Sequence, residues 1–116
     1  MIIGIGIDAV DIKRMEKSLA IKGFKEKTFT AKEVLNCHGN LNEYYATRFA
    51  AKEAVFKAIG KPKDWRLIET LNDENGKPYI TYRQEFEGLN IHISITTETN
   101  LAIAYCVAEK KEENNL

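Results

Sequence analysis

The longest regular pattern of hydrophobic positions lies between Tyr44 and Gly60, in the stretch YYATRFAAKEAVFKAIG. Its large apolar residues recur at helical spacing and fall on one stripe of an α-helix: Tyr45, Phe49, Phe56 and Ile59. Gly60 and Pro62 are typical of the end of a helix. The pattern therefore predicts a long central helix.

Two charged residues lie on the flank of this stripe. Glu53 is roughly 40° around the helix from Phe49 and Lys57 is roughly 80° around. A carboxylate at that position is partly desolvated and still open to a ligand. The simpler interpretation is an ion pair between residues four apart, worth about 0.3 to 0.5 kcal/mol. The helix by itself leaves both interpretations open.

Shorter runs of β-branched or alternating residues predict strands over Ile2 to Ile7, Trp65 to Leu71, Tyr79 to Arg83, Ile91 to Thr97 and Leu101 to Val107. The segment NDENGKP predicts a hairpin turn between the second and third runs. Strict alternation in the fourth run directs its isoleucines to the core and His92 and Ser94 to the other face. We expect an α+β fold, with an antiparallel sheet packed on the long central helix.

A second helical segment, IKRMEKSLAIKGF, follows the first strand. Asp11 is its expected N-cap, whereas Asp8, at the predicted end of the strand, is either a cap or a ligand. Thr30 and Glu33 have the spacing of a capping box and predict another helix from Thr30. His38 follows in a loop without an acid or nucleophile beside it, so we expect a surface histidine.

Length and charge restrict the possible partners. A chain of 116 residues indicates one domain, residues 1–116, and the charged segment 109–116 is expected to be a frayed tail. The 17 basic and 17 acidic side chains cancel, so no global field favours nucleic acid or membrane. Between Lys13 and Lys32, however, there are six lysines and one arginine but only two glutamates, which gives this segment a net charge of +5. This basic segment is either a solvated surface or a docking surface for an acidic partner.

Compartment is indicated by the cysteines and by the N-terminal stretch. Cys37 and Cys106 lack metal-ligand spacing, which favours reduced thiols. The opening MIIGIGID does not have the pattern of a signal peptide, and no apolar run is long enough to span a membrane. We expect a cytoplasmic protein.

The candidate chemistry depends on two carboxylates from distant parts of the chain, Asp8 and Glu53. If the fold brings them within about 4 Å, they repel by roughly 4 kcal/mol at an effective dielectric constant of 20, so a cation must balance them. Mg²⁺ fits, because it is commonly held by one or two carboxylates, waters and substrate phosphates. Lys57, one helical turn beyond Glu53, could hold a phosphate oxygen of the same ligand. No Cys/His cluster supports zinc.

Four motifs, in this order, resemble the phosphopantetheinyl transferases of the holo-acyl-carrier-protein synthase type: GIGID, RFAAKEAVFKAIG, NGKP and HISIT. The likeness covers nearly the whole chain. Members of that family transfer the 4′-phosphopantetheine arm of coenzyme A to a serine of an apo carrier protein and release 3′,5′-ADP. The resemblance implies this reaction for the present chain, with assembly as a homotrimer whose active sites lie between subunits.

The resemblance also implies residue roles. Asp8 and Glu53 would be the magnesium ligands, and Lys57 would lie along the pyrophosphate; these three are the candidate catalytic residues. The coenzyme A side would be lined by Arg48, Asn75, Gly76, Lys77, Pro78 and His92. Lys13 and Arg14 would belong to the surface that docks the acidic helix of the carrier, in agreement with the basic segment. Either Glu53 or a metal-bound water could accept the serine proton.

Two features depart from the family pattern. Thr97 stands where the family usually has a second histidine after the HxSI strand, and it cannot carry charge. The segment GKPKDW after the central helix replaces a glycine-rich turn and predicts a shortened loop. These departures leave two alternatives: a relative that binds coenzyme A or a carrier without transfer, or a structural domain in which Glu53 and Lys57 form only a surface pair.

Overall fold

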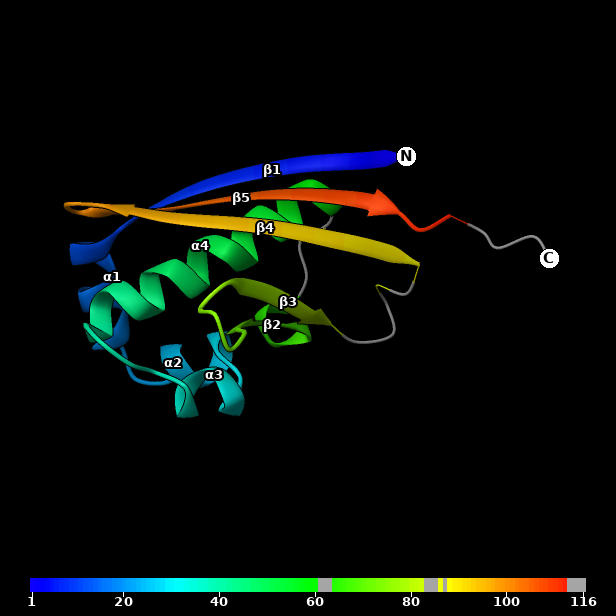
Figure 1. Cartoon of the computed structure of the whole chain (residues 1–116). Coiled ribbons are helices and arrows are strands. Elements are labelled where there is room, and N and C mark those ends of the chain that lie inside the picture. Colours follow the sequence, from blue (N-terminus) through cyan, green and yellow to red (C-terminus); the bar gives the residue numbers. More distant parts are fainter. Residues whose placement is uncertain (61–63, 83–85, 87, 113–116) are drawn as a thin grey trace.

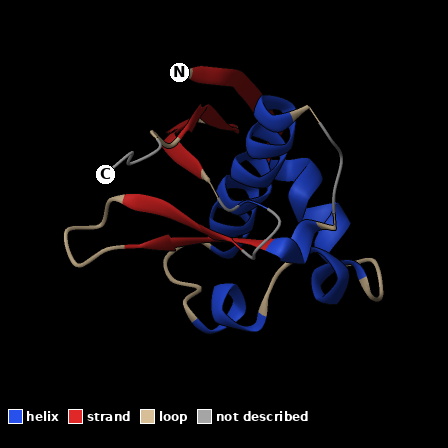
Figure 2. Ribbon diagram, turned by 90° about the vertical axis from the view of Figure 1, so that its right-hand side faces the viewer, coloured by secondary structure: helices blue, strands red, loops and turns tan. Residues whose placement is uncertain are grey.

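A computed structural model describes residues 1–60, 64–82, 86 and 88–112, and its arrangement is shown in Figures 1 and 2. In chain order the elements are β1 Ile2–Asp11, α1 Ile12–Leu19, α2 Phe24–Thr28, α3 Ala31–Leu35, α4 Leu41–Ile59, the 3₁₀ turn η1 Trp65–Leu67, β2 Ile68–Asn72, β3 Pro78–Tyr82, β4 Leu89–Glu98 and β5 Leu101–Lys110. The predicted α+β class and antiparallel pairing are confirmed.

Three strands form an antiparallel sheet in the order β1-β5-β4, and β2 and β3 form a separate hairpin. Figure 1 shows α4 crossing beneath the sheet, with the hairpin and the short helices on the far side of α4. The alternation in β4 is as predicted: Ile91, Ile93 and Ile95 pack against the core, and His92 and Ser94 are exposed. The sheet thus has one face on α4 and one outer face.

Two glycines allow β1 to lie directly on α4. A Cβ atom at Gly4 would be 1.7 Å from the carbonyl oxygen of Ala58, and one at Gly6 would be 2.0 Å from that of Ala54. Contacts this close exclude every larger residue, so the two backbones touch where a side chain would otherwise separate them. Strand β1 also continues to Asp11, so the prediction that Asp8 ends the strand was wrong. Asp8 lies within β1 and pairs with Ala104, whereas Asp11 caps α1 as predicted.

Helix α4 begins at Leu41, three residues before the predicted helix, because the Asn40 side chain accepts a hydrogen bond from the Glu43 backbone and caps it. Its end at Gly60, with φ of 78°, agrees with the prediction, while Pro62 lies outside the described residues. The prediction that α4 buries a single apolar stripe was too narrow. The helix is buried nearly all round, since the sheet covers one side and the hairpin and short helices cover the other.

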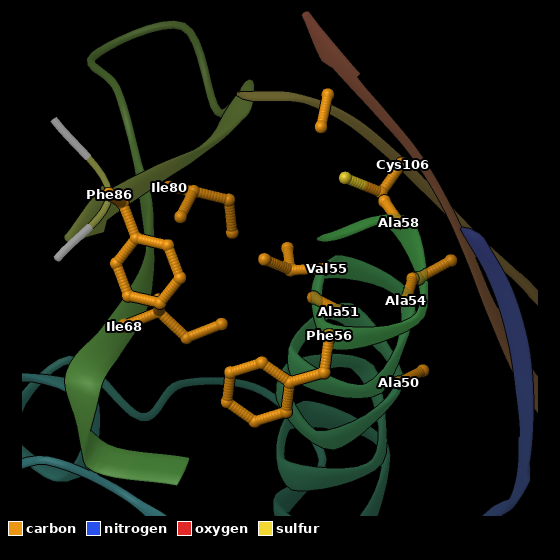
Figure 3. Packing of buried hydrophobic residues seen from close by; sticks show 12 residues of the cluster. Ala50, Ala51, Ala54, Val55, Phe56, Ala58, Ile68, Ile80, Phe86 and Cys106 are labelled. Atoms are coloured by element: carbon orange, nitrogen blue, oxygen red, sulfur yellow. The ribbon is translucent and has the colours of Figure 1, made fainter. Parts of the chain in front are cut away.

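The core between α4, the sheet and the hairpin is shown in Figure 3. Small residues of α4 face the sheet, and larger ones, among them Val55 and Phe56, meet Ile68 and Ile80 of the hairpin and Phe86. This division of residue size lets the sheet approach closely while the hairpin packs through full side chains.

Several boundaries differ from the predicted ones. The helix expected over residues 12–24 ends at Leu19, and the chain resumes as α2 after Gly23, whose φ of 86° interrupts the helix. The strand expected from Trp65 begins as a 3₁₀ turn capped by Asp64. Strand β5 runs to Lys110, so the first two residues of the segment expected to fray are paired in the sheet. Arg83 and residues 113–116 lie outside the described residues.

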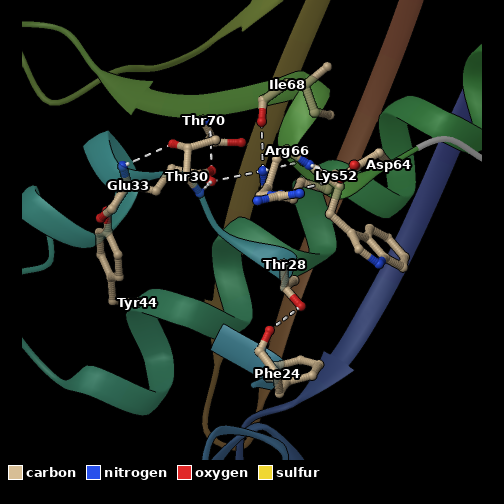
Figure 4. Close-up of polar contacts among 11 residues, drawn as sticks. Phe24, Thr28, Thr30, Glu33, Tyr44, Lys52, Asp64, Arg66, Ile68 and Thr70 are labelled. Atoms are coloured by element: carbon tan, nitrogen blue, oxygen red, sulfur yellow. Dashed lines mark hydrogen bonds and ion pairs between the residues drawn. The ribbon is translucent and has the colours of Figure 1, made fainter. Parts of the chain in front are cut away.

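An ion pair with no solvent exposure, Glu33 with Lys52, joins α3 to α4 (Figure 4). Lys52 Nζ lies 2.8 Å from Glu33 Oε1 and donates to the carbonyl oxygens of Trp65, at 2.7 Å, and Ile68, at 2.6 Å. All three donors of the ammonium are therefore used. Burial lowers the pKa of Lys52, and the Glu33 carboxylate opposes that shift.

Glu33 is equally well bonded. Its carboxylate accepts hydrogen bonds from the backbone N–H groups of Thr30 and Thr70, each at 3.0 Å. The first of these bonds completes the predicted capping box. The sequence pattern identified the cap but gave no sign of Lys52, which the predicted stripe left at a polar position. The pair ties α3, α4, η1 and β2 together.

We predict that Lys52→Met lowers the free energy of unfolding by about 3 to 5 kcal/mol, because it leaves the Glu33 carboxylate buried without its counter-ion. Urea unfolding followed by circular dichroism measures the change. Lys57→Met is the matched control, since it removes a lysine that is 54% exposed in its pair and should cost about 0 to 1 kcal/mol. Equal losses in the two variants would contradict the role given to the buried pair.

Candidate active site

Asp8, Glu53 and Lys57 meet where β1 crosses α4. Asp8 belongs to the set of β1 residues, with Gly4 and Gly6, whose side of the strand faces the helix. Lys57 Nζ reaches across to donate to Asp8 Oδ1 and to the carbonyl oxygen of Ile7, both at 3.0 Å. The close contact of the two backbones thus brings residues 49 positions apart within hydrogen-bond distance.

The electrostatics of this group are those of two acids near one base. Burial, and to a smaller extent the charge of Asp8, raise the pKa of Glu53, while Lys57 opposes the rise. Glu53 is half-buried, and Lys57 forms its ion pair with Asp8, not the i,i+4 pair with Glu53 that was the simpler interpretation of the sequence. One ammonium therefore balances one of two neighbouring carboxylates, and a negative charge is left over.

This donor set fits Mg²⁺. Asp8 and Glu53 offer hard carboxylate oxygens and an excess negative charge, and among the described residues there is no cluster of three or more His, Cys, Asp and Glu that would form a full protein cage. Magnesium is commonly bound by one or two carboxylates, with water and substrate phosphates completing its coordination. The two residues predicted as metal ligands lie where they could act together.

A cavity of about 230 Å³ opens beside Asp8, between β1, α1, α2 and α4. Arg14 of α1 lines it together with Phe24 and Phe49. Arg14 and Lys13 are both exposed on α1. The basic helix α1, which the resemblance predicts to dock an acidic partner, therefore shares this cavity with Asp8.

The residues predicted to bind coenzyme A divide into two places. Arg48 is buried in α4 and reaches the β2–β3 hairpin: its guanidinium donates to the Asn72 side chain and, at 3.1 Å, to the Thr47 hydroxyl. Asn72 in turn donates to the carbonyl oxygen of Gly76, at 2.9 Å. The turn residues Asn75, Gly76 and Lys77, with Pro78 at the start of β3, are thereby positioned near Arg48.

His92 lies elsewhere. It is on the outer face of the sheet, opposite Val107, and its Nε2 is 2.7 Å from Glu109 Oε1. The imidazole of His92 lowers the pKa of Glu109. Since Asp8 faces α4 and His92 faces away from it, one chain does not bring these two residues together.

The structure also brings together three residues that the sequence patterns did not connect. His38, expected as a surface histidine, is exposed, but it also lines a cavity of about 210 Å³ with Arg48 and Thr97. These residues come from a loop, α4 and the end of β4, and nothing in their spacing marks them as neighbours. The shortened loop predicted after Gly60 includes residues 61–63, which lie outside the described residues.

Comparisons with known proteins agree on one family. The family model described as "4'-phosphopantetheinyl transferase superfamily" matches residues 4–106. A holo-[acyl-carrier-protein] synthase of Fusobacterium nucleatum is 42% identical over 120 residues, covering 92% of this chain and 98% of that protein. One from Cytophaga hutchinsonii is 40% identical over 113 residues, covering 90% and 89%.

Solved structures give the same result. A holo-(acyl-carrier-protein) synthase from Bacillus anthracis in complex with CoA (3',5'-ADP) superposes with a TM-score of 0.84 at 36% identity, covering 96% of this chain and 99% of that one. The Helicobacter pylori holo-[acyl-carrier-protein] synthase in complex with coenzyme A has a TM-score of 0.79 at 30% identity, with 90% and 99% covered.

Fold and site define a transferase of the 4'-phosphopantetheinyl type. Within that superfamily the chain belongs to the holo-[acyl-carrier-protein] synthase family, and it is an enzyme of that family. The resemblance found in the four sequence motifs is confirmed.

We predict that Glu53→Gln becomes more stable relative to wild type as the pH rises from about 4 toward 8 in the absence of metal. The pKa of Glu53 is raised in the folded state, so its protonated form favours folding, and that contribution is lost as the pH rises through the folded-state pKa. Glutamine does not ionise, so the variant does not lose a contribution of this kind as the pH rises. Urea midpoints at several pH values measure the difference, and parallel curves for the two proteins would contradict the prediction.

Proposed function

We propose that this chain transfers the 4′-phosphopantetheine group from coenzyme A to a serine of an apo acyl carrier protein and releases 3′,5′-ADP, with Mg²⁺ as cofactor. The meeting of Asp8, Glu53 and Lys57 beside the basic helix is the observation that carries the proposal. Relatives that are named holo-[acyl-carrier-protein] synthases, two of them in complex with coenzyme A, support the reaction and the donor.

In this reaction the serine oxygen forms a bond to the β-phosphorus of coenzyme A. The bond from that phosphorus to the bridging oxygen breaks, and the bridging oxygen leaves with 3′,5′-ADP. Negative charge develops on the phosphoryl oxygens and the leaving phosphate, where fixed positive charge is most effective. Lys57 would supply this positive charge, and its hydrogen bond to Asp8 would keep the ammonium directed at the phosphoryl group.

Asp8 and Glu53 would hold the magnesium ion. When bound, Mg²⁺ supplies Lewis-acid polarisation of a phosphoryl oxygen. Glu53 has a second possible role, as acceptor of the serine proton. Its raised pKa is a change in the direction that makes a carboxylate a better base.

The carrier would approach across α1. The basic segment includes exposed Lys13 and Arg14, and Arg14 lines the cavity that opens beside Asp8. An acidic helix docked there brings its own charge against the basic segment and its serine toward the carboxylates. Coenzyme A would extend toward Arg48 and the turn Asn75 to Pro78, with His92 contributing from another copy of the chain.

A homotrimer would explain why His92 lies on the outer face of the sheet. That face carries exposed apolar side chains on the two strands β1 and β5: Ile3, Ile5, Ile7, Leu101 and Tyr105. A row of this kind favours association, and a second copy seated on it could bring its own site to His92.

Cys37 and Cys106 are both free thiols, which supports a reducing compartment such as the cytoplasm.

We predict that apo carrier, coenzyme A and Mg²⁺ incubated with this protein give a carrier heavier by one phosphopantetheine in mass spectrometry. Asp8→Ala and Glu53→Ala should each lower the rate by about 10²-fold or more, because each removes a carboxylate that would hold the magnesium ion, and the ion is what would stabilise negative charge in the transition state. Removal of Mg²⁺ by a chelator should have a similar effect. Glu112→Ala, which truncates an exposed carboxylate outside the site, is the control.

Full activity in either Asp8→Ala or Glu53→Ala would remove the metal-site assignment. Calorimetric binding of coenzyme A without product, across several carriers, would favour the alternative of a binding module.

We predict that Ile5→Glu converts the protein to a folded monomer in light scattering coupled to size-exclusion chromatography, and that it also lowers transfer. The charge would lie in the middle of the apolar row, where association requires its desolvation. Leu35→Glu is the matched control, since Leu35 is 83% exposed but lies on α3, away from the sheet. A wild-type monomer that is fully active would rule out the shared site.

A further inference from the structure

The outer face of the sheet carries a charged pair, His92 of β4 with Glu109 of β5, in which His92 Nε2 lies 2.7 Å from Glu109 Oε1. In the antiparallel register His92 is opposite Val107, so Glu109, two residues further along β5, is its diagonal neighbour on the same face. The proposed function places His92 beside coenzyme A and gives Glu109 no role. The sequence motifs likewise include His92 but not Glu109.

Glu109 is the acceptor in this contact. The hydrogen bond and the charge of His92 lower the pKa of Glu109 against a small opposing effect of desolvation, and the amino group of Met1 acts in the same direction as His92. Glu109 is therefore ionised at neutral pH, and an ionised carboxylate has no hydrogen to donate. The hydrogen of the contact must lie on Nε2 of His92.

This hydrogen bond determines which nitrogen of His92 is available to a ligand. With Nε2 donating to Glu109, the free nitrogen is Nδ1, for which the described part of the chain supplies no hydrogen-bond partner. The imidazole side chain is 59% exposed, so a ligand can reach it. A protonated ring in this position can donate from both nitrogens, to Glu109 on one side and to an anionic oxygen on the other.

The other strand neighbours of His92 on this face cannot hold the ring in the same way, because none of them is a formally charged residue. They are Asn90 and Ser94 on β4, Val107 and Tyr105 on β5, and Ile5, which continues the row beyond Val107 on β1. The orientation of an imidazole ring about χ2 is only weakly restricted by its own torsional preference. Among these strand neighbours, the Glu109 carboxylate is thus what selects one orientation.

We propose that Glu109 is a positioning residue of the transfer reaction: its carboxylate holds Nε2 of His92 and leaves Nδ1 free for the coenzyme A bound by a neighbouring copy of the chain. This inference rests on the proposed function, which supplies the ligand and the shared site. Glu109 does not itself touch coenzyme A. Its effect on the reaction must therefore pass entirely through His92.

The first test is a double-mutant cycle of Glu109→Gln, His92→Ala and the double variant, with kcat and KM for coenzyme A measured separately. Glutamine keeps the shape of Glu109, but it can accept from Nε2 or donate to it, so it no longer selects one state of the ring. Glu109→Gln should raise KM about three- to fivefold with kcat within about twofold of wild type. His92→Ala should raise KM about tenfold.

In the His92→Ala background, Glu109→Gln should change KM by less than about 1.5-fold, because its effect has no other route. Effects that multiply would overturn the proposal, and so would a wild-type KM in Glu109→Gln. Glu109→Asp keeps the charge and should have a KM within about twofold of wild type. Glu112→Gln, the same substitution at an exposed carboxylate three positions further along, is the matched control and should have the KM of wild type.

Light scattering separates positioning from a contact that only supports assembly, since the pair lies on the face where copies are proposed to associate. All the variants should keep the mass of wild type at the assay concentration. A Glu109→Gln protein that loses both assembly and transfer would show a purely structural contact and would overturn the proposal.

A second test needs no ligand. The chain has two histidines, His38 and His92, so NMR of the imidazole nitrogens can follow each, with His92→Ala providing the assignment. At pH 8.5, where a histidine is mostly neutral, Nε2 of His92 should carry the hydrogen in wild type. In Glu109→Gln the His92 signals should move toward a mixture of both tautomers, while those of His38 stay in place. His92 signals that do not respond would overturn the proposal.

The two proposals can fail separately. If wild type binds coenzyme A without transferring, the proposed function fails, and calorimetric dissociation constants for the same cycle decide on Glu109. If wild type neither binds nor transfers, both fail. If wild type transfers and Glu109→Gln matches it in KM and in the NMR signals, only the inference about Glu109 fails.

Discussion

The direct contact between the backbones of β1 and α4 determines where the candidate chemistry can occur. Gly4 and Gly6 leave no Cβ atoms between the strand and the helix, and Ala54 and Ala58 present only methyl groups and carbonyl oxygens to it. Because the strand lies this close, Asp8, two residues beyond Gly6, comes within reach of Lys57. A Cβ atom at either glycine would push the strand outward and separate Asp8 from Lys57. The packing of β1 on α4 therefore determines the geometry of the candidate site.

A second constraint acts on the other side of α4. The Glu33–Lys52 pair uses every donor of its ammonium and joins α3, η1 and β2 to the helix. The hairpin held in this way places Asn72 against Arg48. A buried ion pair is costly to desolvate and is not by itself evidence of extra stability. Its effect here is geometric, because it determines how the hairpin lies on α4 and therefore where the Arg48 guanidinium is directed.

Local patterns predicted much of this molecule, and the reasons for the failures are physical. The hairpin turn, the caps at Asp11 and Thr30 and the alternation in β4 depend on residues close in sequence, and all agree with the structure. Burial of α4 on both sides could not be read from one helix, because the second covering layer comes from the hairpin. Lys52 was missed for the same reason: a lysine at a polar position looks solvated until Glu33, 19 positions earlier, is placed beside it. His38, Arg48 and Thr97 likewise become neighbours only in the fold.

The sheet separates two sets of polar residues that the family resemblance assigns to one reaction. Alternation along an antiparallel strand is strict, so the register that turns Asp8 toward α4 also turns Ile5 and Ile7 outward, and the register of β4 turns His92 outward beside them. A change of rotamer cannot move a side chain from one face of a sheet to the other. If both sets act on one coenzyme A, the second set must come from another copy, and the apolar side chains around His92 are what such a copy would cover. Under that condition, the same alternation that builds the core of this small chain would require assembly to complete the candidate site.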